Sequence, residues 1–164
     1  MRLGLTFGAL LALAGAGAAP LLAQDVGLGV GAKAPAVTVQ DLDGKPVDLG
    51  RYLGREPLVL EFWATWCPLC QALEPSLKAA HARYGGAVRF VAIGVGVNQS
   101  PASIRRHLAA HPLPFPVLYD ATGAAVRAYA APTTSYIVVV DKTGRVTYTG
   151  AGAEQDIAAV LAKL

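Results

Sequence analysis

The stretch LVLEFWATWCPLCQALEPSL, Leu58–Leu77, decides the fold because it joins a buried strand to an amphipathic helix. The run LVLEFW is apolar on both faces, which is typical of a central strand covered on both sides. Apolar residues then recur at helical spacing, so we expect a helix over Cys67–Tyr84. The only two cysteines of the chain, Cys67 and Cys70, lie at the start of this helix, and Glu61 places a carboxyl group within the strand.

The rest of the chain alternates strands with helices, which predicts an α/β fold with a central mixed sheet flanked by helices on both faces. The length of 164 residues, with 54% hydrophobic and 15% charged residues, fits one packed domain. The expected strands are 36–39, 47–49, 58–63, 88–97, 117–119 and two about a turn at 142–144, and the expected helices are 67–84, 101–110, 124–129 and 154–164.

The N-terminus has the order of a secretory signal peptide: a basic start, an apolar stretch and then small residues. Cleavage is expected after Ala23, with Ala18 as an alternative, although the apolar Leu3–Leu22 is also nearly long enough to be an uncleaved membrane anchor. The predicted divisions are a signal peptide at 1–23, a flexible lead-in segment at 24–34 and a folded domain at 35–164. We therefore expect an exported protein, in the periplasm or another extracytoplasmic compartment.

The charge of the chain is small, with 14 basic and 11 acidic residues and a formal net charge of +3. The basic residues are scattered and form no patch or stripe, so a nucleic-acid partner is not expected. We expect a near-neutral domain that is monomeric.

The two cysteines could serve as a structural staple or as a metal site. A bridge across two intervening residues closes a very small loop, and the stabilisation by a disulfide falls with loop size. Zinc needs about four ligands, and the only histidines, His81, His107 and His111, have no paired spacing with Cys67 and Cys70. No metal is therefore expected, although two thiolates can suffice for Cu(I).

A redox pair has a positive physical basis. Cys67 is predicted at the N-terminus of a helix, where the helix dipole and free N–H groups favour a thiolate, so Cys67 is the candidate nucleophile. Pro68 suits the first helical turn, where its missing N–H costs nothing. Cys70, three residues on, is the candidate resolving cysteine that attacks a mixed disulfide at Cys67.

Glu61 is the candidate proton shuttle for this pair. A carboxyl group in a central strand is desolvated, which raises its pKa and suits it to proton transfer near neutrality. Its expected partner is Cys70, which loses a proton when it resolves the mixed disulfide. The alternatives are that Glu61 reaches the sheet edge or pairs with an arginine such as Arg89.

Three segments together resemble the thioredoxin superfamily and, within it, the exported TlpA/ResA-like thiol–disulfide oxidoreductases. They are FWATWCPLC at Phe62–Cys70, LEPSLKAAHARY after it, and APTTSYIVVVDKTGRV at Ala131–Val146. The resemblance implies a thioredoxin-like fold with an N-terminal β-hairpin and a central insertion over Arg89–Tyr119. It also implies reduction of protein disulfides, as in cytochrome c maturation, with a membrane-embedded electron donor and no cofactor.

The resemblance also implies roles for single residues. Cys67 and Cys70 form the active-site disulfide, and Trp66 with the intervening Pro68 and Leu69 contacts the substrate. The family has a cis proline beside this disulfide, which corresponds to Pro132. Such a proline exposes the backbone of the preceding residue, Ala131, for strand-like pairing with a substrate chain.

Two rival functions belong to related proteins. A copper chaperone on the same fold usually has more widely spaced cysteines and a histidine near the APTT segment, which this chain lacks. A peroxiredoxin-type peroxidase needs a proline seven residues and a threonine three residues before its reactive cysteine, and Leu60 and Ala64 occupy those positions. The direction of electron flow stays open, because only the resemblance favours a reductase over an oxidase or isomerase.

Overall fold

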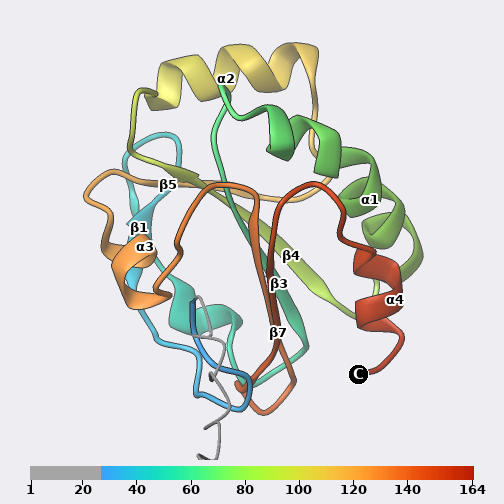
Figure 1. Cartoon of the computed structure of the whole chain (residues 1–164). Helices are drawn as coiled ribbons and strands as arrows, with labels where there is room; N and C mark the ends of the chain where they lie inside the picture. The colour runs from blue at the N-terminus through green and yellow to red at the C-terminus, as the bar shows by residue number, and fades with distance from the viewer. Residues whose placement is uncertain (1–26) are drawn as a thin grey trace, which may run out of the picture.

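The computed structural model describes residues 27–164, so the predicted signal peptide lies outside the described residues. Seven strands form one mixed sheet in the order β2-β1-β5-β4-β3-β6-β7 (Figure 1). The strands are β1 (Thr38–Gln40), β2 (Pro46–Asp48), β3 (Leu58–Trp63), β4 (Arg89–Val95), β5 (Val117–Asp120), β6 (Tyr136–Val140) and β7 (Val146–Ala151). The helices are the 3-10 helix η1 (Leu49–Tyr52), α1 (Pro68–Tyr84), α2 (Pro101–Ala110), α3 (Ala124–Ala128) and α4 (Ile157–Leu161).

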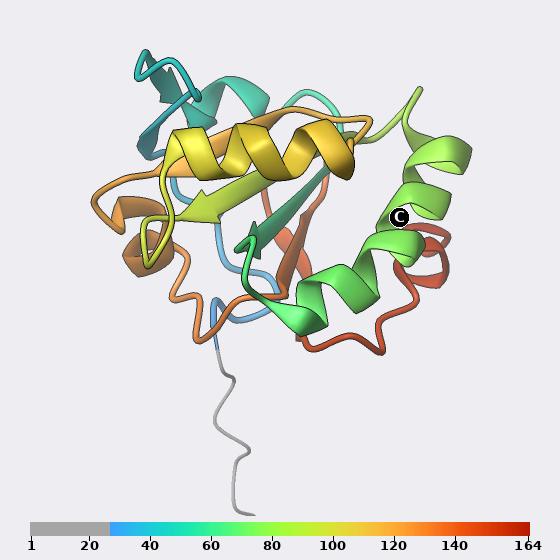
Figure 2. The same cartoon turned by 90° about the horizontal axis from the view of Figure 1, so that it is seen from above.

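Helices cover both faces of the sheet, as predicted. The strands β3, β4 and β5 are parallel, and α1 and α2 connect them in turn. Right-handed crossovers in one direction place both helices on one face, and α4 packs against α1 there (Figures 1 and 2). Phe62 points to the other face, where its ring lies 5.7 Å from that of Tyr129, the residue after α3.

Burial fixes α1 against the sheet. Every residue of β3 is buried, and Leu73 and Leu77 of α1 are 0% and 1% exposed. Full burial of such a side chain contributes about 1.5–3 kcal/mol. The first turn of α1 is thereby held at the edge where β3, β4 and β5 end and β6 begins.

Two segments differ from the sequence-based expectation. Part of the lead-in segment predicted to be flexible is paired, because Gly31 N–H donates to the Val146 carbonyl at 2.8 Å and Lys33 bridges to Arg145. The edge strand β7 offers the unpaired backbone groups that this segment uses. The last helix begins at Ile157, three residues later than predicted, because the Asp156 side chain caps it.

Within residues 27–164, no helix is both long enough and apolar enough to cross a membrane.

Candidate active site

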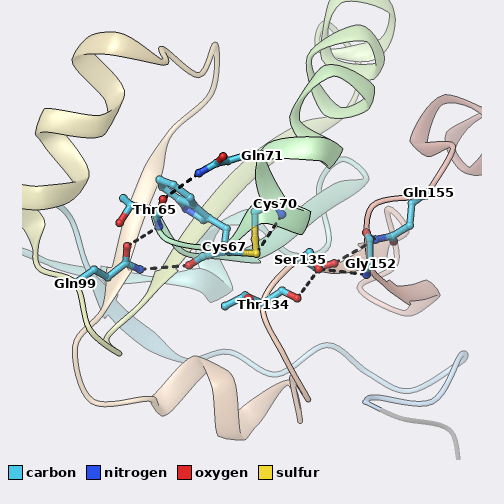
Figure 3. Close-up of a disulfide and its surroundings, with 10 residues drawn as sticks. Thr65, Cys67, Cys70, Gln71, Gln99, Thr134, Ser135, Gly152 and Gln155 are labelled. Carbon is cyan, nitrogen blue, oxygen red and sulfur yellow. Dashed lines mark hydrogen bonds between the residues drawn. A yellow bond between two sulfur atoms is a disulfide. The ribbon is translucent and has the colours of Figure 1, made fainter.

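Cys67 and Cys70 form a disulfide at the N-terminus of α1 (Figure 3). Cys67 is the N-cap residue of the helix, and the Cys70 backbone N–H donates to its Sγ at 3.1 Å. Pro68 occupies the first turn, as expected for a residue without an N–H. The helix dipole and this N–H both favour negative charge on the Cys67 sulfur once the disulfide is reduced.

The disulfide is buried beneath an exposed apolar surface. Cys67 and Cys70 are only 3% and 4% exposed, whereas Trp66 and Leu69 are 46% and 52% exposed. Val97, in the loop after β4, is 56% exposed and lies beside Trp66, whose Nε1–H donates to the Val97 carbonyl at 2.8 Å. We call these three residues, Trp66, Leu69 and Val97, the apolar surface patch. Exposed apolar residues gathered in this way commonly mark a contact site.

Glu61 lies inside the protein on the same face of β3 as α1. Its side chain is buried, and burial, together with the nearby charge of Glu74, raises its pKa to about 8. Glu61 and Cys70 line one small cavity, which brings the candidate proton shuttle next to the candidate resolving cysteine. Arg89 pairs with Glu56 at 2.8 Å, so the alternative pairing of Arg89 with Glu61 is wrong.

His107 of α2 also lines this cavity. It is half-buried, and its ring lies 5.6 Å from the Trp63 ring and 4.8 Å from that of His111. Burial and His111 lower the pKa of His107, while Glu74 raises it. Residues 27–164 contain no group of three or more His, Cys, Asp or Glu side chains placed to hold a metal ion.

Gln99, which the sequence analysis did not single out, braces the loop that carries the cysteines (Figure 3). Its Oε1 accepts from the Thr65 N–H at 3.0 Å, and its Nε2 donates to the Val95 carbonyl at 2.7 Å. Nε2 also lies 3.3 Å from the Trp63 carbonyl. The contacts with Thr65 and Trp63 join residues more than 30 positions apart, so no local sequence signal identifies Gln99.

The segment before β6 lies on the other side of the disulfide, where Figure 3 shows Thr134 and Ser135. The cis peptide bond expected at Pro132 is absent, since no peptide bond in the described chain is cis. The chain turns instead at Ala130 and Ser135, which have φ of 47° and 58°. Buried Gln155 fixes the segment by donating to the Ser135 carbonyl at 3.1 Å, while Pro132 stays exposed.

A single α/β domain with a C-x-x-C disulfide at the first turn of a helix is a thioredoxin-like protein. The Redoxin family model matches residues 29–164, and the chain belongs to this family. It is 27% identical over 118 residues to the thiol-disulfide oxidoreductase ResA of Bacillus thuringiensis subsp. konkukian, covering 71% of this chain and 66% of the relative. The chain thus spans slightly less than two thirds of that relative's length.

Solved structures support the same placement. A secreted Mycobacterium tuberculosis disulfide oxidoreductase, homologous to Escherichia coli DsbE, is 31% identical with a TM-score of 0.66, covering 78% of this chain and 96% of that one. A putative thiol:disulfide interchange protein DsbE of Chlorobium tepidum is 26% identical with a TM-score of 0.72, covering 83% and 94%. The fold is therefore thioredoxin-like and the chain is ResA-like, as the sequence motifs indicated.

Proposed function

We propose that this protein is an exported thiol–disulfide oxidoreductase that acts on protein cysteines through Cys67 and Cys70. The observation that carries the proposal is the disulfide at the first turn of α1, with the Cys70 N–H directed at the Cys67 sulfur. The similarity to the thiol-disulfide oxidoreductase ResA and to the secreted Mycobacterium tuberculosis disulfide oxidoreductase supports the same class of activity.

In the reducing direction the reaction has two exchange steps. The Cys67 thiolate attacks one sulfur of the substrate disulfide, and the other substrate sulfur leaves as a thiolate. Cys70 then gives its proton to Glu61, and its thiolate attacks Cys67 Sγ to release the second substrate thiolate. Two electrons pass to the substrate, and a membrane-embedded dithiol donor restores the Cys67–Cys70 dithiol.

The substrates that we propose are exported proteins, including those of cytochrome c maturation. The apolar surface patch offers contact area for a polypeptide beside the buried disulfide. Exposed Pro132 and the half-buried Ala131 before it belong to the segment that leads to Ser135, across the disulfide from the patch. We expect a substrate cysteine with apolar neighbours to approach the disulfide between the apolar surface patch and this segment.

The reduction potential of the Cys67–Cys70 pair tests both the activity and its direction. Trp66 fluorescence in graded thiol–disulfide buffers reports the fraction of oxidised protein. A potential near that of thioredoxin, about −270 mV, is expected for a reductase. A value near about −120 mV marks a disulfide donor and contradicts the reducing direction. Failure of the pair to cycle at all contradicts the proposed activity.

A further inference from the structure

Glu61 shares its cavity with a second acid, Glu74, which lies on α1 one turn after Cys70. Glu61 is 4% exposed, whereas the Glu74 side chain is 20% exposed. The cavity volume is about 10 Å³, close to what one water molecule needs. The cavity therefore joins a fully buried carboxyl group to one that reaches solvent.

The indole of Trp63 gives a second, independent indication that the cavity can hold a water molecule. Trp63 lines the cavity, and its buried Nε1–H has no hydrogen-bond partner within residues 27–164. A buried N–H of this kind is usually satisfied, and ordered water often supplies the partner. One water in the cavity would lie among groups that can donate and accept protons.

The proposed function requires such a route. Each exchange cycle moves one proton on or off Cys70, and Glu61 must pass that proton on before it acts again. We propose that Glu74 is the outer member of a two-carboxyl proton relay, which exchanges the Cys70 proton between Glu61 and solvent through this cavity. The inference rests on the proposed function, and it makes Glu74 a positioning residue that acts through Glu61.

Two other ionisable side chains lie close to these acids, one on α1 and one on α2. On α1, Lys78 Nζ lies 2.5 Å from Glu74 Oε1, and the Glu74 side chain is still 20% exposed. On α2, burial and His111 lower the pKa of His107, so its ring is neutral at neutral pH and adds no positive charge beside Glu61.

Reduced protein mixed with excess dithiobis-nitrobenzoate, an aromatic disulfide dye, separates the steps. Attack by Cys67 releases one coloured thiolate, and resolution by Cys70 releases the second. Stopped-flow traces at a series of pH values give the rate constant of the second phase. The pH profile of this rate constant has a midpoint and, at high pH, a plateau. The variant is Glu74→Gln. Lys78→Gln breaks the same ion pair but keeps the carboxyl group, and Glu56→Gln removes a distant ion-paired carboxylate.

For Glu74→Gln we expect the midpoint to fall by about one pH unit, because a neighbouring negative charge is lost. We expect the plateau to fall by about tenfold, less than the roughly hundredfold loss in Glu61→Gln. A lower midpoint with an unchanged plateau, or the same plateau loss in Lys78→Gln, overturns the relay. So does a plateau loss in His107→Gln without one in Glu74→Gln.

The two phases keep the relay and the proposed function apart. A normal first phase in every variant, with a second phase changed only by loss of Glu61 or Glu74, supports the relay. An absent first phase in the unaltered protein contradicts the thiol–disulfide activity itself.

Discussion

Replacing Glu61 by glutamine should stabilise the oxidised protein progressively as the pH rises. Burial raises the pKa of Glu61 from 4.5 to about 8, so the native state holds a proton that the unfolded state has lost throughout this window. Stability falls with pH wherever the unfolded state binds fewer protons. The contribution of Glu61 is therefore fully present below pH 4.5 and is lost as the pH rises to about 8.

The magnitude follows from the size of the shift. One unit of pKa difference corresponds to about 1.4 kcal/mol, so the full window corresponds to about 5 kcal/mol. Glutamine keeps the shape of the side chain and does not titrate. The difference in unfolding free energy between Glu61→Gln and the unaltered protein should therefore grow by about 1.4 kcal/mol per pH unit through the middle of the window.

Urea unfolding of the oxidised protein at intervals from about pH 5 to 9 measures this difference. Glu56→Gln is the matched control, because Glu56 is a partly exposed, ion-paired glutamate just before the start of β3. The unfolding free energy of Glu56→Gln, plotted against pH, should run parallel to that of the unaltered protein. Parallel curves for Glu61→Gln as well would refute the reasoning, since Glu61 would then titrate alike in the folded and unfolded states.

Three further predictions concern the cysteines, the loop brace and the core. Cys70→Ser should trap a substrate protein on Cys67 as a mixed disulfide that survives non-reducing electrophoresis; its absence would place the nucleophile elsewhere. Gln99→Ala should cost about 1–3 kcal/mol in urea unfolding and alter Trp66 fluorescence, since it leaves backbone groups unpaired; an unchanged spectrum would show that the loop needs no brace. Leu77→Ala should cost about 2–5 kcal/mol, because Leu77 is 1% exposed, and a cost below 1 kcal/mol would contradict its place in the core.

The elements nearest the cysteines were predictable because local chemistry determines them. The apolar run over 58–63 and the helical spacing of the apolar residues after it predicted β3 and α1, with ends that differ by at most one residue from those observed. The helix expected over 101–110 is likewise present as α2, where Ser100 and Ser103 form a capping box. The last helix was predicted too long because Gln155 is held by the backbone of Ser135 and Gly152 rather than by a helix.

The parts of the site that depend on tertiary packing were not predictable. Glu61 drew attention because an acid in an apolar strand is conspicuous, but nothing in the sequence indicates that Glu74 and His107 face the same cavity. The cis peptide bond predicted at Pro132 rested on the family pattern alone. That prediction was wrong, since the chain turns at Ala130 and Ser135 instead. Contacts between distant segments decide such details.

The connection between β4 and β5 supplies three separate properties of the site. Val97 gives part of the apolar surface patch, Gln99 braces the cysteine loop and His107 lines the cavity beside Glu61. The cysteines themselves belong to a different connection, between β3 and β4. Substitutions in the β4–β5 connection can therefore alter part of the apolar surface patch, the loop brace and the cavity while Cys67 and Cys70 stay unchanged.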